Sequence, residues 1–173
     1  MKTVYLIGGT MGVGKTTVCR VLKRKLRDCV MLDGDWCWDS DPFKVTEETK
    51  AMVLDNITYL LNSFIKCSAY SNVVFCWVMH RREITDAILS SLKGRFAVKI
   101  VYLTASEQTL RERLSKDIQS GQRSEDVIER SVQRIPLYDV LPSVKINTDS
   151  KTPSEIAEEI IALKPCCHVS QDI

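Results

Sequence analysis

Short apolar runs alternate with helical patterns along most of the chain. Five of these runs have the length of a strand, and they are residues 4–7, 30–32, 72–79, 98–103 and 144–146. The stretches between them carry apolar side chains three and four residues apart, which is the spacing of one helix face. Apolar strands without alternation are typical of a parallel sheet covered by helices on both faces. The pattern therefore predicts an α/β fold in three αβα layers around a five-stranded parallel sheet.

Polar residues suited to helix capping precede three of the expected helices: Thr46, Ser106 and Thr152. The last signal is the most complete, because Pro153 occupies the first helical position and Glu155 stands three residues after the cap. No repeat, linker or low-complexity segment interrupts the pattern. We therefore expect a single domain over residues 1–165 and a short C-terminal tail over residues 166–173.

Composition and charge exclude several classes of protein. The chain has 173 residues, of which 45% are hydrophobic and 27% are charged, and its formal net charge is +2. This apolar content excludes a disordered or collagen-like chain, and no apolar run reaches the roughly 18 residues that a membrane-spanning helix needs. The near-neutral balance gives no support for nucleic-acid binding. We expect neither a nucleic acid nor a membrane among the partners, and either a monomer or a homodimer.

Seven cysteines are numerous for this length, but their spacing argues against a disulfide framework. Their number is odd and none forms a C-x-x-C pair. The first apolar run, at residues 4–7, is also too short for a secretory leader. We interpret the cysteines as reduced thiols and expect a cytoplasmic protein.

A phosphate-binding motif follows the first expected strand. Residues 9–16 read G-T-M-G-V-G-K-T, which fits G-x-x-x-x-G-K-[ST] at every fixed position between a strand and an amphipathic helix. Backbone N–H groups and the helix N-terminus hold phosphate oxygens in such a loop. Lys15 would contact the β- and γ-phosphates of ATP, and the Thr16 hydroxyl would bind Mg²⁺. The residues expected to hold the nucleotide are Gly9, Thr10, Met11, Gly12, Val13, Gly14, Lys15, Thr16 and Thr17.

Two carboxylates follow the second expected strand. Asp33 and Asp35 flank Gly34 at the carboxyl end of that strand, the edge at which open α/β sheets bind ligands. One carboxylate could hold Mg²⁺, while the other orients or deprotonates an acceptor hydroxyl. An Asp-Gly-Asp sequence also suits a plain turn. Next to a phosphate-binding loop, we favour the functional interpretation.

The order of these motifs resembles that of shikimate kinases. The recurring segments are the phosphate loop, L-D-G-D at 32–35, R-I-P-L-Y at 134–138, N-T-D at 147–149 and T-P-S-E at 152–155. L-D-G-D and the stretch at 76–81 also look like gluconate kinases. The resemblance implies a nucleoside-monophosphate-kinase-like fold with strand order 2-3-1-4-5 and a small mobile lid at about residues 116–126. It also implies phosphoryl transfer from ATP to a small-molecule acceptor.

The resemblance implies roles for individual residues. Asp33 would be the Mg²⁺-side acid, and Asp35 the acceptor-hydroxyl contact and base. Arg123 would be the lid arginine that meets phosphate on closure, and Arg134 would contact a substrate anion. Two further residues would cover the faces of adenine, namely Pro153 and Lys116. Three other arginines of the lid region are interpreted as part of a solvated helix face: Arg111, Arg113 and Arg130.

Further acceptor-side candidates leave the identity of the acceptor open. His80 and Arg81 follow the third expected strand, and His80 could bind a substrate anion or hydroxyl or end the strand. Trp36 and Trp38 beside the acidic turn could stack on a ring-shaped acceptor or serve as packing anchors. The sequence departs from shikimate kinases where their glycine triplet is replaced by the segment that begins at Trp77.

These observations predict an ATP-dependent kinase that acts on a small hydroxylated or anionic metabolite. The acceptor could be a sugar acid, a shikimate-like compound or an antibiotic. One alternative is a nucleoside or nucleotide kinase, and another is a nucleotide-binding regulatory switch without a small-molecule acceptor. The third expected strand contains no acidic residue, which argues against an ATP-hydrolysing switch.

Overall fold

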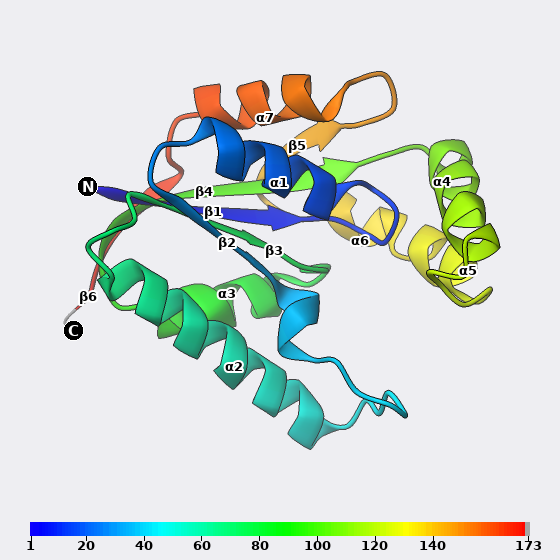
Figure 1. Cartoon of the computed structure of the whole chain (residues 1–173), viewed down its shortest axis with the longest axis horizontal. Coiled ribbons are helices and arrows are strands. Elements are labelled where there is room, and N and C mark those ends of the chain that lie inside the picture. Colours follow the sequence, from blue (N-terminus) through cyan, green and yellow to red (C-terminus); the bar gives the residue numbers. More distant parts are fainter. Residues whose placement is uncertain (172–173) are drawn as a thin grey trace.

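The computed structural model describes residues 1–171 and arranges them in three layers (Figure 1). Two helices cover each face of a central sheet: α1 (Lys15–Lys25) and α7 (Pro153–Ala162) on one face, α2 (Glu47–Lys66) and α3 (Arg82–Ser91) on the other. The buried apolar side chains form two clusters, one between each helix pair and the sheet. This division confirms the three-layer arrangement expected from the apolar runs.

The strand order confirms the expected topology. The strands are β1 (Lys2–Gly8), β2 (Cys29–Asp33), β3 (Asn72–Cys76), β4 (Gly94–Thr104), β5 (Val144–Asn147) and β6 (Cys167–Gln171). Their main path runs β2-β3-β1-β4-β5, and all neighbours along it are parallel. The carboxyl ends of β1, β2 and β3 therefore lie at one edge of the sheet, together with the segments that follow them.

The sheet has a sixth strand that we did not expect. The segment assigned to a C-terminal tail pairs antiparallel with β4, and Cys167 lies opposite Val98. β5 pairs with β4 only from Val101 onward, so the earlier part of β4 would otherwise be an open edge. Such an edge leaves backbone N–H and C=O groups unpaired, and β6 satisfies them. The domain thus continues past residue 165.

Shorter elements connect the layers at the carboxyl edge of the sheet. They are the 3₁₀ turn η1 (Gly34–Cys37) and the helices α4 (Glu107–Gln119), α5 (Val127–Val132) and α6 (Ile135–Asp139). Two short helices, α5 and α6, follow α4 in place of one continuous helix. Pro136 lies in the first turn of α6, where its missing N–H costs no hydrogen bond. None of the helices in residues 1–171 is long and apolar enough to cross a bilayer.

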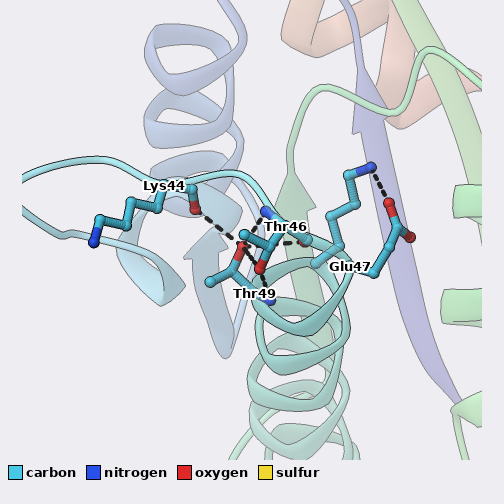
Figure 2. Close-up of polar contacts among 5 residues, drawn as sticks. Lys44, Thr46, Glu47 and Thr49 are labelled. Carbon is cyan, nitrogen blue, oxygen red and sulfur yellow. Dashed lines mark hydrogen bonds and ion pairs between the residues drawn. The ribbon is translucent and has the colours of Figure 1, made fainter.

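The start of α2 is fixed by a capping box (Figure 2). The Thr46 hydroxyl accepts a hydrogen bond from the Thr49 amide at 3.1 Å, and the Thr46 amide donates to the Thr49 hydroxyl at 2.9 Å. Thr49 also donates to the Lys44 carbonyl at 3.0 Å. These bonds confirm the expected cap and anchor the end of the loop that leads away from the acidic turn.

Candidate active site

The loop between β1 and α1 has the backbone shape of a phosphate cradle. Gly14 caps α1 with φ 99°, a left-handed conformation that side chains other than glycine rarely adopt. The next residue, Lys15, folds its side chain back over the loop, and Nζ donates to the Thr10 carbonyl at 2.9 Å. The N–H groups at the N-terminus of α1 and the Lys15 side chain thus lie at the same concave loop, as phosphate binding requires.

Lys15 has the electrostatic setting of a phosphate contact. Burial lowers the pKa of its ammonium, and the nearby charges of Asp33 and Asp35 oppose this effect. Within residues 1–171, Lys15 forms no ion pair. The Lys15 ammonium is half-buried and donates to the Thr10 carbonyl, so a bound anion would stabilise its charge further. The residues present therefore fit the phosphate groups of ATP.

Thr16 and Asp33 form the candidate magnesium site. The Thr16 hydroxyl donates to Asp33 Oδ2 at 2.6 Å, and Asp33 is only 5% exposed. The Asp33 Oδ1 atom accepts from the Asp35 amide at 3.2 Å, which fixes the turn between the two acids. A hydroxyl and a carboxylate oxygen at this spacing suit the all-oxygen shell of Mg²⁺. The donor set therefore fits the metal predicted for it.

Asp35 lies in η1, directly after β2, with part of its surface open to solvent. Partial burial raises the pKa of its carboxyl, and the neighbouring Asp33 raises it further. The charges of Lys15 and Arg123 lower it. A carboxylate with a raised pKa at the mouth of a phosphate cradle is suited to accepting a proton from a hydroxyl.

Arg123, the expected lid arginine, lies near the same charged groups. Arg123 follows α4 and donates to Asp117 Oδ2 at 3.2 Å. Its charge still lowers the pKa values of both Lys15 and Asp35. The structure therefore brings the three predicted catalytic residues together, although the role of each remains a prediction. The Asp117 carboxylate of α4 holds the Arg123 guanidinium in this position.

Two of the three arginines that we expected on a solvated helix face are surface residues. Arg111 pairs with Glu107 and Glu129, and Arg130 pairs with Asp126. Each of these pairs is largely solvent-exposed, so it contributes little to stability. These two arginines belong to a solvated face of α4 and α5.

The interpretation of Arg113 as a surface residue was wrong. Its guanidinium donates to the Val13 carbonyl of the phosphate loop at 3.3 Å, and to the Thr148 hydroxyl and carbonyl at 3.0 Å each. Arg113 thus joins the phosphate loop to the loop after β5. Lys116, which was expected to cover adenine, is exposed one turn further along α4, and Pro153 is exposed at the start of α7. Arg113, rather than Lys116, is the cation of α4 that contacts the loop after β5.

Sequence reasoning also missed Ser131. It is fully buried in α5, where its hydroxyl donates to the Met11 carbonyl at 2.7 Å. Its own carbonyl accepts from the Thr10 hydroxyl at 3.0 Å. Ser131 thereby ties α5, which follows the expected lid segment, to the phosphate loop. No motif marks this serine, because its partners lie about 120 residues earlier in the chain.

The predicted anion contacts surround the other side of the site. Arg134 is half-buried, burial lowers the pKa of its guanidinium, and its Nη1 lies 2.8 Å from the Met11 sulfur. Burial also lowers the pKa of His80, and the charges of Arg134 and Arg81 lower it further. His80 and Arg81 line a cavity of about 570 Å³ with residues of α6 and the turn after it. Basic side chains thus gather beside β3, and the carboxylate of Glu83 lines the same cavity.

The tryptophans of the acidic turn differ in their surroundings. Trp38 packs on Phe43 with ring centroids 4.5 Å apart, so it is the packing anchor that we left open as an alternative. Trp36 is 58% exposed and stays available to an acceptor. The third strand ends at Cys76, earlier than the expected residue 79, and the Trp77 amide still bonds to the Ile7 carbonyl of β1 at 3.2 Å. This brings Trp77 next to the acidic turn.

Comparison with known proteins agrees with this geometry. The family described as AAA domain matches residues 6–134, and the chain belongs to that family. The chain is similar to a shikimate kinase of Legionella pneumophila (strain Corby), with 28% identity and 93% of each chain covered. It is also similar to a "Putative adenylate kinase" of Pyrococcus furiosus, with 27% identity over 92% of this chain and 83% of that protein.

The fold agrees with solved kinase structures. A gluconokinase of Sinorhizobium meliloti 1021 superposes with a TM-score of 0.68 at 19% identity, covering 92% of this chain and 90% of the other. The chain therefore has a P-loop kinase fold, is similar in sequence to shikimate kinases, and is a phosphotransferase. This confirms the resemblance, the fold and the enzyme class that the sequence indicated.

Proposed function

We propose that the chain transfers the γ-phosphoryl group of ATP to a hydroxyl of a small anionic metabolite. The observation that carries this proposal is the position of Asp35. It is a solvent-accessible carboxylate of raised pKa beside the phosphate-loop lysine, and its turn is fixed by Asp33. An acid placed there can receive the proton of an attacking hydroxyl.

The residues divide the work of phosphoryl transfer. Lys15 and the loop amides hold the β- and γ-phosphates, and Asp35 aligns the acceptor hydroxyl and takes its proton. Thr16 and Asp33 would hold Mg²⁺, which neutralises phosphate charge when bound. Arg123 turns from Asp117 toward the transferring group as the lid closes, and its charge stabilises the transition state. Closure also excludes water, which limits ATP hydrolysis.

Two arginines beside β3, Arg81 and Arg134, support an anionic acceptor. The charges of both arginines lower the pKa of His80, so an acceptor anion would meet positive charge on this side of the site. A sugar acid, a shikimate-like compound or an acidic antibiotic meets this requirement and carries the hydroxyl that Asp35 needs. Trp36 supplies an exposed ring face for the body of such an acceptor.

A nucleotide kinase is the second candidate. It is favoured by the similarity to a protein named "Putative adenylate kinase". A nucleoside monophosphate would bring its phosphate to Arg134 and its base to Trp36. The two candidates differ in the anionic group, which is a carboxylate in one and a phosphate in the other.

The test is ADP release from Mg·ATP in a coupled assay against a panel of acceptors. The panel covers sugar acids, shikimate, hydroxylated antibiotics and nucleoside monophosphates, with a no-acceptor control. We expect turnover with one class of carboxylate-bearing alcohol and little without acceptor. Saturation by a nucleoside monophosphate alone would replace this proposal with the nucleotide kinase. Hydrolysis that no acceptor changes would favour a nucleotide-binding switch.

A further inference from the structure

The expected lid, at about residues 116–126, begins in the last turns of α4 and ends just before α5. These two helices pack against each other beyond the carboxyl edge of the sheet (Figure 1). Each of them also contacts the phosphate loop, and the two contacts fall on consecutive parts of that loop. The lid is therefore connected at both ends to the residues that are expected to hold ATP.

α4 contacts the phosphate loop at Gly12 and Val13. Arg113 donates to the Val13 carbonyl at 3.3 Å. The Leu114 side chain lies against Gly12, since a Cβ atom added to this glycine would be 2.7 Å from Leu114 Cγ. A glycine at this position therefore lets α4 approach the loop backbone closely. These contacts fix the N-terminal side of the lid.

α5 contacts the phosphate loop at Thr10 and Met11 through a single residue, Ser131. The Ser131 hydroxyl donates to the Met11 carbonyl at 2.7 Å. In the opposite direction, the Thr10 hydroxyl donates to the Ser131 carbonyl at 3.0 Å, and its oxygen also lies 3.0 Å from Ser131 Oγ. Ser131 is fully buried, so solvent does not weaken these bonds. Ser131 thus fixes the C-terminal side of the lid.

Thr10 connects this anchor to the lysine of the phosphate loop. The Thr10 carbonyl accepts a hydrogen bond from Lys15 Nζ at 2.9 Å, while the hydroxyl of the same threonine bonds to Ser131. Lys15 is the side chain expected to contact the β- and γ-phosphates. A continuous path of printed contacts therefore runs from the phosphate-binding ammonium through Thr10 to α5.

We propose that Ser131 is a positioning residue that couples ATP binding in the phosphate loop to the placement of Arg123. A phosphate draws Lys15 toward it, the Thr10 backbone adjusts, and Ser131 passes this shift to α5. Arg123 lies in the short segment between α4 and α5, so it moves with the start of α5. Ser131 itself touches no substrate. The inference rests on the lid role proposed for Arg123.

The inference is tested by amide hydrogen exchange of residues 120–126, measured by mass spectrometry without and with saturating AMP-PNP and Mg²⁺. We expect the nucleotide to slow exchange of this segment about tenfold in the unaltered protein. In Ser131→Ala the slowing should shrink to about twofold or less, while the peptide of the phosphate loop stays protected by bound nucleotide. A merely structural serine would raise exchange in both states and leave their ratio unchanged. An unchanged ratio in Ser131→Ala overturns the inference.

Two further variants control this experiment. Ser91→Ala removes an exposed serine hydroxyl that donates to the Ala87 carbonyl at 2.8 Å within α3, and it should keep the original ratio. Thr10→Val removes the hydroxyl on the loop side and leaves α5 unaltered. It should reduce the ratio less than Ser131→Ala does, because the bond from Ser131 to Met11 remains. If Ser131→Ala does not fold, an unchanged ratio in Thr10→Val overturns the inference.

Kinetics with an acceptor show whether Ser131 acts through Arg123. At saturating ATP, Ser131→Ala should lower kcat about tenfold, because Arg123 is misplaced even when the nucleotide is bound. In an Arg123→Ala background the same substitution should lower kcat little further, since the group that Ser131 positions is already absent. Losses of kcat that simply multiply in the double variant contradict the proposal.

The outcomes also separate this inference from the proposed function. The exchange experiment needs no acceptor and no turnover. If the exchange ratios follow the expectation but no acceptor is phosphorylated, the coupling through Ser131 stands and the proposed function fails. If an acceptor is phosphorylated and Ser131→Ala keeps the original ratio, the kinase stands and Ser131 has no positioning role.

Discussion

The two halves of the site differ in how completely the chain pairs their polar groups. The phosphate half is the loop at residues 9–16 with Asp33, and the acceptor half comprises Asp35, Trp36, Trp77, His80, Arg81 and Arg134. In the phosphate half, hydroxyl and ammonium groups are bound by the chain itself: Lys15 to Thr10, Thr16 to Asp33 and Thr10 to Ser131. In the acceptor half, Arg134 contacts a methionine sulfur, and Trp36 is exposed.

This difference indicates which half of the site is ordered before the substrates bind. The phosphate half is built in advance, as expected when transition-state charge is stabilised by fixed donors. The acceptor half keeps cations and a ring face that a ligand must satisfy. The chemistry therefore depends on a rigid loop, and specificity depends on a surface that a bound acceptor completes.

Lys15→Ala should have the largest effect, because it removes the charge at the centre of the phosphate half. We expect phosphoryl transfer at background level, together with unchanged thermal unfolding. Lys23→Ala, an exposed lysine of the same helix, is the matched control. Normal turnover of Lys15→Ala in the coupled assay would show that the loop does not hold the transferred phosphate.

Asp35→Asn should lower kcat by about 10²–10⁴-fold, because an amide cannot take the proton of the acceptor. The KM for ATP should stay near its original value, since the phosphate half is untouched. Asp39→Asn, in the exposed loop just beyond, should leave kcat unchanged. If both variants turn over at the same rate, the base lies elsewhere and the boundary between the halves is misplaced.

Arg123→Ala should lower kcat by about 10²-fold, the loss expected for one donor to transition-state charge. Arg130→Ala removes a cation that is paired at the surface with Asp126, and should have no comparable effect. Pre-steady-state kinetics would separate chemistry from product release. An Arg123→Ala enzyme with an intact chemical step would assign Arg123 to a structural bond with Asp117.

Arg113→Lys should raise the KM for ATP about tenfold, because lysine cannot reproduce the paired contacts to Thr148 and the phosphate loop. Its kcat should change little, since Arg113 acts on the phosphate half without touching the acceptor half. Arg111→Lys keeps a surface ion pair and serves as the control. A changed kcat with constant KM would place Arg113 in the reaction itself.

The smallest effect concerns pH. Because the pKa of Asp35 is raised, its proton-accepting form is lost at a higher pH than for an ordinary aspartate as the solution is acidified. The acceptor kcat/KM should therefore fall on the acid side with the midpoint of Asp35, and rise as pH increases through it. Asp35→Asn should flatten that limb. An acid limb that survives the substitution belongs to another group.

The phosphate half could be predicted from sequence because its parts are contiguous. Residues 9–16 form one motif, and Asp33 and Asp35 follow directly on a strand whose end fixes their place at the sheet edge. The helix caps at Thr46 and Thr152 could also be predicted from neighbouring residues, and the strand order followed from the resemblance. The geometry of the phosphate loop, the acidic turn and the caps depends on the local backbone conformation, which a few consecutive residues determine.

The missed features depend on contacts between distant segments. Arg113 has the spacing of a surface helix, but its partners lie 35 and 100 residues away, and only the fold brings them together. β6 is a strand because β5 leaves part of the β4 edge unpaired, which no property of the tail itself indicates. Trp77 appeared in the sequence only as a departure from a glycine-rich pattern. In the structure, its side chain packs on Gly34 across two strands.

The most direct test of the account follows the γ-phosphoryl group of labelled ATP in a single turnover, with the acceptor that the panel identifies. The account predicts that label appears on the acceptor in equal amount to ADP, with little free phosphate, and that Asp35→Asn slows this transfer while binding ATP normally. Label released as free phosphate at the same rate with and without acceptor would contradict it.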